Sequence, residues 1–108
     1  MTVRELKDTL GLTVFALPEP EREAVGGYAG DLLSWVMGRA EPGNVWLTIM
    51  SGVNVCAVAL LTEVSCVLLT EGVTPDADLL RRAEEHGVNL LGTAESTFLT
   101  ALRLRDLL

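Results

Sequence analysis

The sequence predicts an α/β domain in which helices pack around a mainly parallel sheet of about four strands. Three short apolar runs, residues 45–50, 66–70 and 89–92, are each followed by a turn or cap signal and then by a segment with helical spacing. That rhythm is typical of parallel strands joined by crossover helices. In addition, 49% of the residues are hydrophobic but only 5% are aromatic, so Leu, Val and Ala must build the core, as in strands buried on both faces. With 108 residues, the chain is expected to form a single domain, 1–108.

The N-terminal part is expected to contain a helix, a strand and a surface connection. Residues 2–10 carry leucines four positions apart and are followed by Gly11, a common helix stop. Residues 12–17 form an apolar, β-prone run and are predicted to be the first strand. The polar segment 18–23 contains two prolines and is expected to lie on the surface.

A glycine-rich segment, 26–30, comes next. It could cradle a phosphate, but it lacks the spacing of the glycine-rich nucleotide fingerprints and has no following lysine. A turn or flexible linker is therefore the favoured interpretation. Asp31 is expected to open a helix that runs to about Gly38. Its apolar face would consist of Leu32, Leu33, Val36, Met37 and Ala40.

Two further helices are expected after the first two apolar runs. The helix over 54–63 is apolar nearly all round, which predicts burial on two sides. In the next connection, Thr74 is the predicted N-cap and Pro75 the first helical residue. The helix over 76–86 should then end at Gly87, which suits the left-handed conformation of a helix stop.

The last apolar run leads into a closing helix. Thr93 is predicted to cap this helix, which is expected over 94–104. The side chains predicted to face inward are Phe98, Leu99 and Leu102.

The charge of the chain limits its partners. Fifteen acidic residues against eight basic ones give a net charge of −7. A protein that binds a phosphate backbone needs clustered Lys and Arg, so no nucleic acid is expected as a partner, and docking on anionic lipid is disfavoured for the same reason. No uninterrupted apolar run reaches the ~20 residues of a membrane helix. The N-terminal segment lacks a signal-peptide core, so a cytoplasmic protein is expected.

Catalytic side chains and metal ligands are sparse. Cys56 and Cys66 lack the spacing of a CxxC pair and have no histidine nearby, so buried structural thiols are favoured over a redox pair or half a metal site. His86, the only histidine, lies at a predicted helix end, where the dipole favours a positive charge. We therefore expect no catalytic residue, no metal site and no cofactor.

Polar residues follow the predicted strands, whose carboxyl ends should meet at one edge of the sheet, near helix N-termini. Two interpretations are open. In one, Asn54, Thr74 and Thr93 only cap helices. In the other, backbone N–H groups form a shallow pocket for an adenine nucleotide or a phosphate ester. The residues of that pocket would be Thr48, Ser51, Gly52, Asn54, Thr70, Glu71, Gly72, Thr93 and Ser96.

A second candidate surface would serve self-association. Trp35 lies off the apolar stripe of its helix, and an exposed aromatic side chain suits an interface, although core packing is equally compatible with its neighbours. The apolar helix over 54–63 contributes Val55 and Val58 to the same hypothesis. A homodimer with Trp35, Val55 and Val58 at its interface is therefore a prediction of the sequence.

Residues 66–98 contain, in order, an apolar strand, a Thr-Glu-Gly turn, a helix opened by proline, a second strand and a Thr/Ser-rich helix start with Phe. This order resembles the DRTGG domain, and residues 27–34 and 46–49 resemble its short stand-alone members. The resemblance spans about 28–104. That family is similar to the N-terminal domain of HPr kinase, and it occurs between CBS domains of some inorganic pyrophosphatases as a non-catalytic, often dimerising regulatory piece. Stand-alone members accompany iron-only hydrogenase genes.

The resemblance implies a non-catalytic regulatory or scaffolding module, homodimeric and acting with an enzyme of a metabolic system such as a hydrogenase. The alternative is a sensor that binds an adenine nucleotide at the strand ends. One departure matters: Thr70-Glu71-Gly72 stands where the family has Thr-Gly-Gly. Glu71 places a carboxylate where a phosphate would approach the backbone, which puts any anion-binding role of this turn in question. There is no P-loop, so kinase activity does not carry over.

Overall fold

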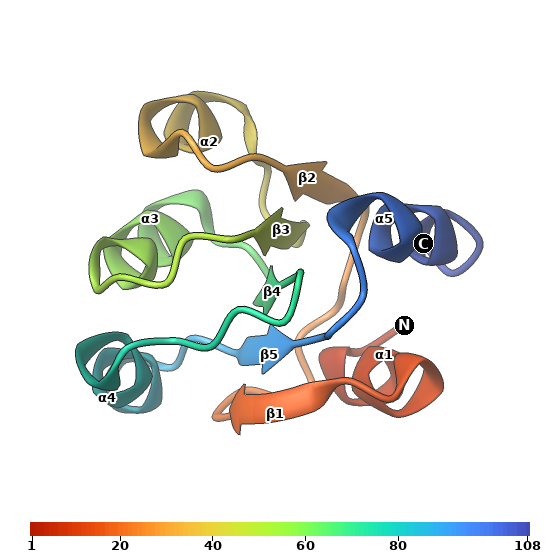
Figure 1. Ribbon diagram of the computed structural model, residues 1–108, viewed down its shortest axis with the longest axis horizontal. Helices are drawn as coiled ribbons and strands as arrows, with labels where there is room; N and C mark the ends of the chain where they lie inside the picture. Colours follow the sequence, from red (N-terminus) through yellow and green to blue (C-terminus); the bar gives the residue numbers. More distant parts are fainter.

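The computed structural model describes all 108 residues as one five-stranded sheet flanked by helices (Figure 1). Its elements are α1 (Val3–Leu10), β1 (Thr13–Ala16), β2 (Gly27–Ala29), α2 (Leu33–Arg39), β3 (Val45–Thr48), α3 (Asn54–Thr62), β4 (Cys66–Leu69), α4 (Ala77–His86), β5 (Leu90–Gly92) and α5 (Thr97–Arg105). The strand order is β1-β5-β4-β3-β2, with β2 to β5 parallel and β1 antiparallel to β5. The predicted α/β class is confirmed. No helix has both the length and the apolar character that crossing a membrane requires.

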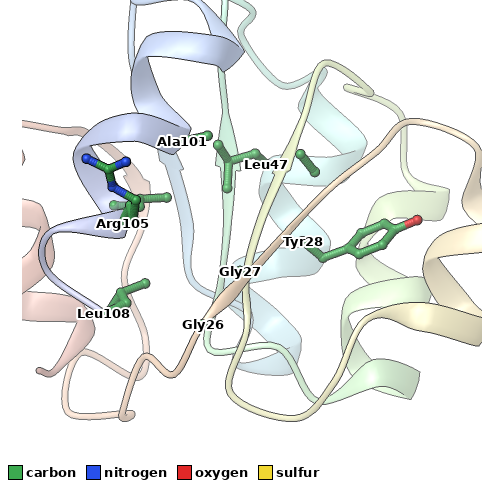
Figure 2. Close-up of a pocket in the computed structure, with 9 residues that line it drawn as sticks. Gly26, Gly27, Tyr28, Leu47, Ala101, Arg105 and Leu108 are labelled. Carbon is green, nitrogen blue, oxygen red and sulfur yellow. The ribbon is translucent and has the colours of Figure 1, made fainter.

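The strand that the sequence did not predict is β2. It lies in the glycine-rich segment that was expected to be a turn or linker, and it pairs with β3 through Gly27 opposite Val45 and Ala29 opposite Leu47. Backbone groups alone make this pairing, so it needs no β-prone side chains. Tyr28 supplies the one large side chain of the strand, and Figure 2 shows it directed away from α5. The opposite face of β2 therefore carries almost no side-chain volume.

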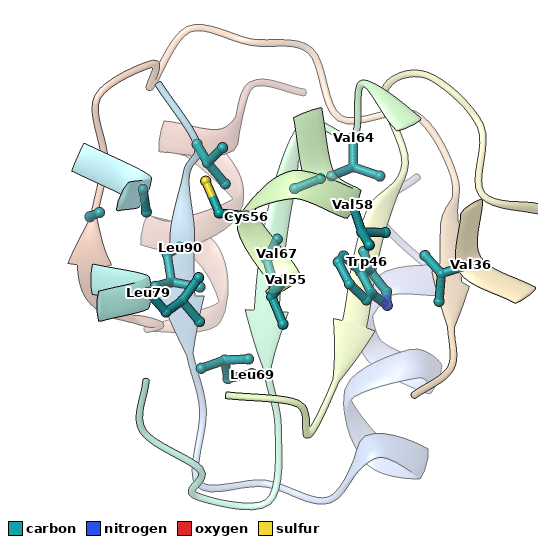
Figure 3. Close-up of a cluster of buried hydrophobic side chains, with 14 residues drawn as sticks. Val36, Trp46, Val55, Cys56, Val58, Val64, Val67, Leu69, Leu79 and Leu90 are labelled. Carbon is teal, nitrogen blue, oxygen red and sulfur yellow. The ribbon is translucent and has the colours of Figure 1, made fainter. Parts of the chain in front are cut away.

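Helices cover both faces of the sheet. α2, α3 and α4 lie on one face, and α1 and α5 lie on the other (Figure 1). β3 and β4 are buried along their whole length, as expected for central strands of this class. Alternate side chains of the strands point to opposite faces. Trp46, Val67, Leu69 and Leu90 pack under α2 to α4 (Figure 3), whereas Val45, Leu47, Cys66, Leu68 and Leu91 pack under α1 and α5.

The helix boundaries confirm part of the cap predictions. Thr2 accepts a hydrogen bond from the N–H of Glu5 and forms a capping box with it, and Gly11 ends α1 in the left-handed conformation. Gly87 ends α4 in the same way. The predicted start of α4 at Thr74 and Pro75 is wrong. Asp76 is the N-cap, because its carboxylate accepts a hydrogen bond from the N–H of Leu79.

The prediction for α5 is wrong in two respects. Ser96 rather than Thr93 is the N-cap, and the helix begins at Thr97. Phe98, expected to face inward, is 71% exposed, and Leu99 and Leu102 are exposed as well. The buried side chains of α5 are Thr100 and Leu104, because the helix lies across β2 and β3 near the sheet edge and buries only a narrow stripe.

The faces of α2 and α3 also differ in part from the prediction. Trp35 is 53% exposed, one of the two alternatives that the sequence left open, and Val36 is buried. Leu32 and Met37 face solvent, contrary to the expected apolar face of α2, because this short helix covers only the edge of the sheet. In α3, Val55 and Val58 are only 1% and 5% exposed and pack in the core (Figure 3). Since the chain itself covers both side chains, their predicted place at a dimer interface is wrong.

Candidate functional site

The loops that follow β3, β4 and β5, residues 49–53, 70–76 and 93–96, lie together at the carboxyl edge of the sheet, and we call them the rim. The parallel order of these three strands brings them to one edge, as the sequence predicted. Hydrogen bonds link neighbouring loops: Glu71 N–H donates to the Glu95 carbonyl at 2.8 Å, and Asp76 N–H donates to the Ser51 carbonyl at 3.0 Å. The rim is thus a connected surface, and its function depends on which polar groups remain unpaired.

Thr48 is engaged within the chain. Its hydroxyl donates to Asp31 Oδ1 at 2.8 Å, and the same carboxylate oxygen accepts the N–H of Ile49 at 2.9 Å. The hydroxyl oxygen in turn accepts the N–H of Met50 at 3.2 Å. Asp31 therefore fixes the turn after β3 to the segment between β2 and α2, instead of opening α2 as its position in the sequence predicted. Thr48 is buried by this arrangement and is not exposed to a ligand.

The predicted anion site at the turn after β4 is closed by its neighbours. The N–H groups of Glu71 and Gly72 donate to the carbonyls of Glu95 and Thr93, at 2.8 and 3.0 Å. The hydroxyls of Thr70 and Thr97 are 2.6 Å apart and form a hydrogen bond. Backbone donors that could have cradled a phosphate are therefore already paired.

The carboxylate of Glu71 fills the position of an anion at the start of α5. Its Oε2 accepts the N–H of Thr97 at 2.8 Å, where the positive end of the helix dipole favours negative charge. Ser96 Oγ accepts another orphan donor of the first turn, the N–H of Leu99, at 3.2 Å. Glu71 reaches this position with a φ of 61°, the left-handed region, which explains why glycine is favoured at this turn position. The doubt that the sequence raised about Glu71 thus has a structural basis.

The remaining predicted residues are split between two places. The Ser51 carbonyl accepts the N–H of Asp76 at 3.0 Å, and the Gly52 carbonyl accepts the N–H of Val55 at 3.1 Å. Asn54 is the first residue of α3 rather than its cap, and its side chain lines a cavity between α3 and α4. The structure therefore gathers Thr70, Glu71, Gly72, Thr93 and Ser96 around the start of α5 and leaves Asn54 outside that group.

Two cavities lie outside the turns after β4 and β5, and sequence reasoning predicted neither. One, of about 290 Å³, lies between β2 and α5 (Figure 2), and its lining includes Gly27, Ala101 and Leu104. It exists because Gly27 and Ala29 leave one face of β2 nearly bare. The other, of about 320 Å³, lies between α3 and α4. The one sequence signal for the first cavity was the alternation of small and large residues in Gly27, Tyr28 and Ala29. This signal can be interpreted only when the segment is known to be a strand.

Both thiols are buried. Burial raises the pKa of Cys66 to about 12, an effect that a hydrogen bond with Ser65 and the charge of Arg22 partly offset. Burial also raises the pKa of Cys56, and the nearby positive charge of Arg82 acts in the opposite direction. Neither cysteine forms a disulfide. Both thiols therefore stay protonated at neutral pH, which makes them poor nucleophiles.

Comparison with known proteins gives a fold neighbour and a family. No curated protein matches the chain. The crystal structure of the CBS and DRTGG domains of the regulatory region of Clostridium perfringens pyrophosphatase, complexed with the activator diadenosine tetraphosphate, has a similar fold, with a TM-score of 0.67 and 19% sequence identity. The similarity covers 95% of this chain but 45% of that one. A family model for the DRTGG domain matches residues 36–107, which is two thirds of the sequence, and the chain therefore belongs to the DRTGG domain family.

Proposed function

We propose that this chain is a non-enzymatic, homodimeric regulatory or scaffolding module that acts by binding protein in a metabolic system, with a hydrogenase system as the candidate context. The observation that carries the proposal is a contrast between two kinds of surface. At the rim, hydrogen bonds within the chain pair the polar groups that a substrate would need. On α2 and α5, large apolar side chains face solvent instead.

The α2 surface is the proposed dimer contact. Trp35 is exposed there, and the guanidinium of Arg39 lies 3.8 Å from the centre of its indole ring. Tryptophan and arginine are the side chains that most often dominate binding energy at protein interfaces. Leu32 and Met37, exposed on the same short helix, extend the apolar area. Trp35 therefore remains the proposed centre of the interface after Val55 and Val58 are removed from it.

Light scattering after size exclusion, at micromolar concentration, tests the dimer. The expected mass is twice the 11.6 kDa of the chain. Trp35→Ser should shift the protein toward monomer, whereas the matched variant Phe98→Ser, an exposed aromatic on the opposite layer, should leave the dimer intact. A monomeric mass for the parent chain overturns the dimer. Loss of the dimer in Phe98→Ser alone places the interface on α5 instead.

A second candidate function is an adenine-nucleotide sensor at the rim. It is supported by the fold neighbour, whose regulatory region was crystallised with the activator diadenosine tetraphosphate. The closed hydrogen-bond pattern at Glu71 counts against it, so this candidate requires the rim to rearrange on binding. The side-chain hydroxyl of Ser51 is the best-placed group for a ligand, because only its backbone carbonyl bonds to another residue.

Thermal unfolding with diadenosine tetraphosphate, ATP, ADP and AMP, each with Mg²⁺, tests the sensor. A ligand at 100 times its Kd should stabilise the fold by about 2.7 kcal/mol, a shift of several degrees for a chain of this size. Ser51→Ala and Thr93→Ala should reduce that shift. An equal shift in both variants excludes the rim as the binding place. If no nucleotide shifts the unfolding temperature, the sensor is excluded and the protein-binding module remains as the proposed function.

A further inference from the structure

The cavity between α3 and α4 has a composition unlike the rest of this acidic chain. The two helices are neighbours on the same face of the sheet (Figure 1), and the cavity between them has a volume of about 320 Å³. α3 contributes Val53, Asn54, Ala57 and Leu60, and α4 contributes Arg82 and His86. No acidic side chain lines it, although 15 of the 108 residues are acidic.

Arg82 is an unpaired cation at the edge of this cavity. Its neighbour Arg81 is paired with Asp78 at 3.1 Å and with Glu85 at 3.9 Å, whereas Arg82 forms neither an ion pair nor a side-chain hydrogen bond. His86 lies one helical turn after Arg82 and lines the same cavity. Two nitrogen-bearing side chains thus converge on a space in which the chain itself supplies no counter-charge.

The opposite wall of the cavity is mainly apolar. Val53, Ala57 and Leu60 recur at the spacing of one helix face, so they form a continuous strip along α3. Cys56 forms part of the floor and belongs to the core beneath it. Burial raises the pKa of the Cys56 thiol, and the charge of Arg82 has a smaller, opposite effect. This effect agrees with a guanidinium that lies close to the cavity floor.

We propose that this cavity binds a small organic anion, a carboxylate or a phosphate monoester attached to a compact apolar group. Arg82 would bind the anionic oxygens, with the bidentate geometry that guanidinium groups form with carboxylates and phosphates. Asn54 and His86 would supply further polar contacts, and the strip on α3 would cover the apolar part. A cavity of this volume lies at the small end of ligand sites and suits a compact ligand. This site borders the rim at Val53, but it shares no residue with the turns after β4 and β5 or with the proposed dimer contact.

NMR titration of the full chain tests the proposal. Phenyl phosphate and benzoate serve as anionic probes, and benzyl alcohol serves as the uncharged probe of similar shape. We expect saturable shifts for backbone amides in α3 and α4 with at least one anionic probe. The comparison of phenyl phosphate with benzoate distinguishes the two kinds of anion. Benzyl alcohol should bind about tenfold more weakly or worse, because a charged hydrogen bond is lost.

Three variants separate the roles of the two walls. Arg82→Gln should weaken the anionic probe about tenfold or more, whereas Arg81→Gln, on the same helix but in ion pairs of its own, should bind as the parent does. Ala57→Leu fills the cavity from the solvent side without changing its charge and should abolish binding with no loss of Tm. Equal affinity in Arg82→Gln and Arg81→Gln overturns the proposal. So do shifts that fall outside α3 and α4, or no saturable shift with either anion.

Discussion

Glu71 shows how a single residue can decide whether a site is open. Its backbone has a φ of 61°, and its carboxylate caps the N–H of Thr97. A glycine at this position would leave that N–H to another anion, whereas the carboxylate of this chain occupies it. The sequence revealed the substitution but not the bond, because the turn after β4 and the start of α5 meet only when the sheet is assembled.

Two substitutions of Glu71 separate the contribution of the cap to stability from that of the backbone strain. Glu71→Ala keeps a side chain at positive φ and loses the cap, so the free energy of unfolding should fall by about 1 kcal/mol. Glu71→Gly loses the same cap but relieves a left-handed strain of about 1 kcal/mol, so it should stay close to the parent. Urea unfolding of the two variants measures this difference. If Glu71→Gly is as unstable as Glu71→Ala, the left-handed backbone at this position does not reduce the free energy of unfolding.

Burial of Cys66 predicts how stability changes at alkaline pH. The folded-state pKa is about 12, raised by burial above the ordinary value of 9.0 that the unfolded chain should show. Below pH 9 the thiol is protonated in both states. Above pH 9 the unfolded chain releases the proton first, so the free energy of unfolding should fall with rising pH, by up to about 1.4 kcal/mol per pH unit until the folded thiol ionises.

Urea unfolding of the parent and of Cys66→Ala from pH 8 to pH 11 tests this dependence. The variant should be less stable at pH 8, because it leaves a small void under α1 and α5. Its stability should then fall less steeply with pH, since Cys56 and the other groups contribute equally to both proteins. Parallel curves for the two proteins would contradict the effect of the Cys66 thiol.

Helices and strands were predictable where neighbouring residues determine them. They were not predictable where contacts between residues distant in the sequence determine them. α1 carries its capping box and its glycine stop in adjacent residues, and the sequence predicted both ends. At the start of α4 the sequence predicted Thr74 as the cap. Asp76 is the cap in the structure, and its N–H is bonded to the Ser51 carbonyl, a contact across the rim. β2 is defined entirely by pairing with β3, so no pattern within Gly27–Ala29 could predict it.

Glycines in two elements give opposite predictions. In β5, a Cβ at Gly92 would lie 2.5 Å from Cε2 of Phe15, so Gly92→Ala must displace that ring and should cost about 1–3 kcal/mol. In α2, a Cβ at Gly38 would meet nothing within 4 Å, so Gly38→Ala should stabilise the fold by about 0.5–1 kcal/mol through helix propensity. Thermal unfolding monitored by circular dichroism measures both. A tolerated Gly92→Ala would mean that Phe15 has another place to pack.

At the scale of the molecule, the α/β class and the sheet edge that carries the rim were predictable from the sequence, whereas the hydrogen-bond partners of the polar groups at the rim were not. Alternating strands and helices placed the rim at the correct edge, because parallel strands leave little choice. Whether a rim group is free depends on its partners, as when Asp31 bonds to the hydroxyl of Thr48 from seventeen residues away. The two cavities depend on helix contacts of the same kind, β2 with α5 and α3 with α4. Cavities of this origin leave no motif in the sequence.

The two cores share one sheet, which predicts cooperative unfolding of the whole chain. β3 and β4 contribute alternate side chains to both faces, so loss of either helix layer exposes strands on which the other depends. Leu6 of α1 and Leu79 of α4 are both fully buried, and they lie on opposite faces of the sheet. Leu6→Ala and Leu79→Ala should each cost about 2–5 kcal/mol.

The fluorescence of Trp46, which is buried on the α2–α4 face, reports whether the faces unfold together. In a Trp35→Phe background it is the only tryptophan signal. Leu6→Ala acts on the other face, yet it should shift the Trp46 transition in urea as far as it shifts the circular dichroism transition, with one midpoint for both. A Trp46 midpoint that stays in place while circular dichroism moves would show two independent layers. In that case the α1–α5 layer could open while the α3–α4 cavity remains folded.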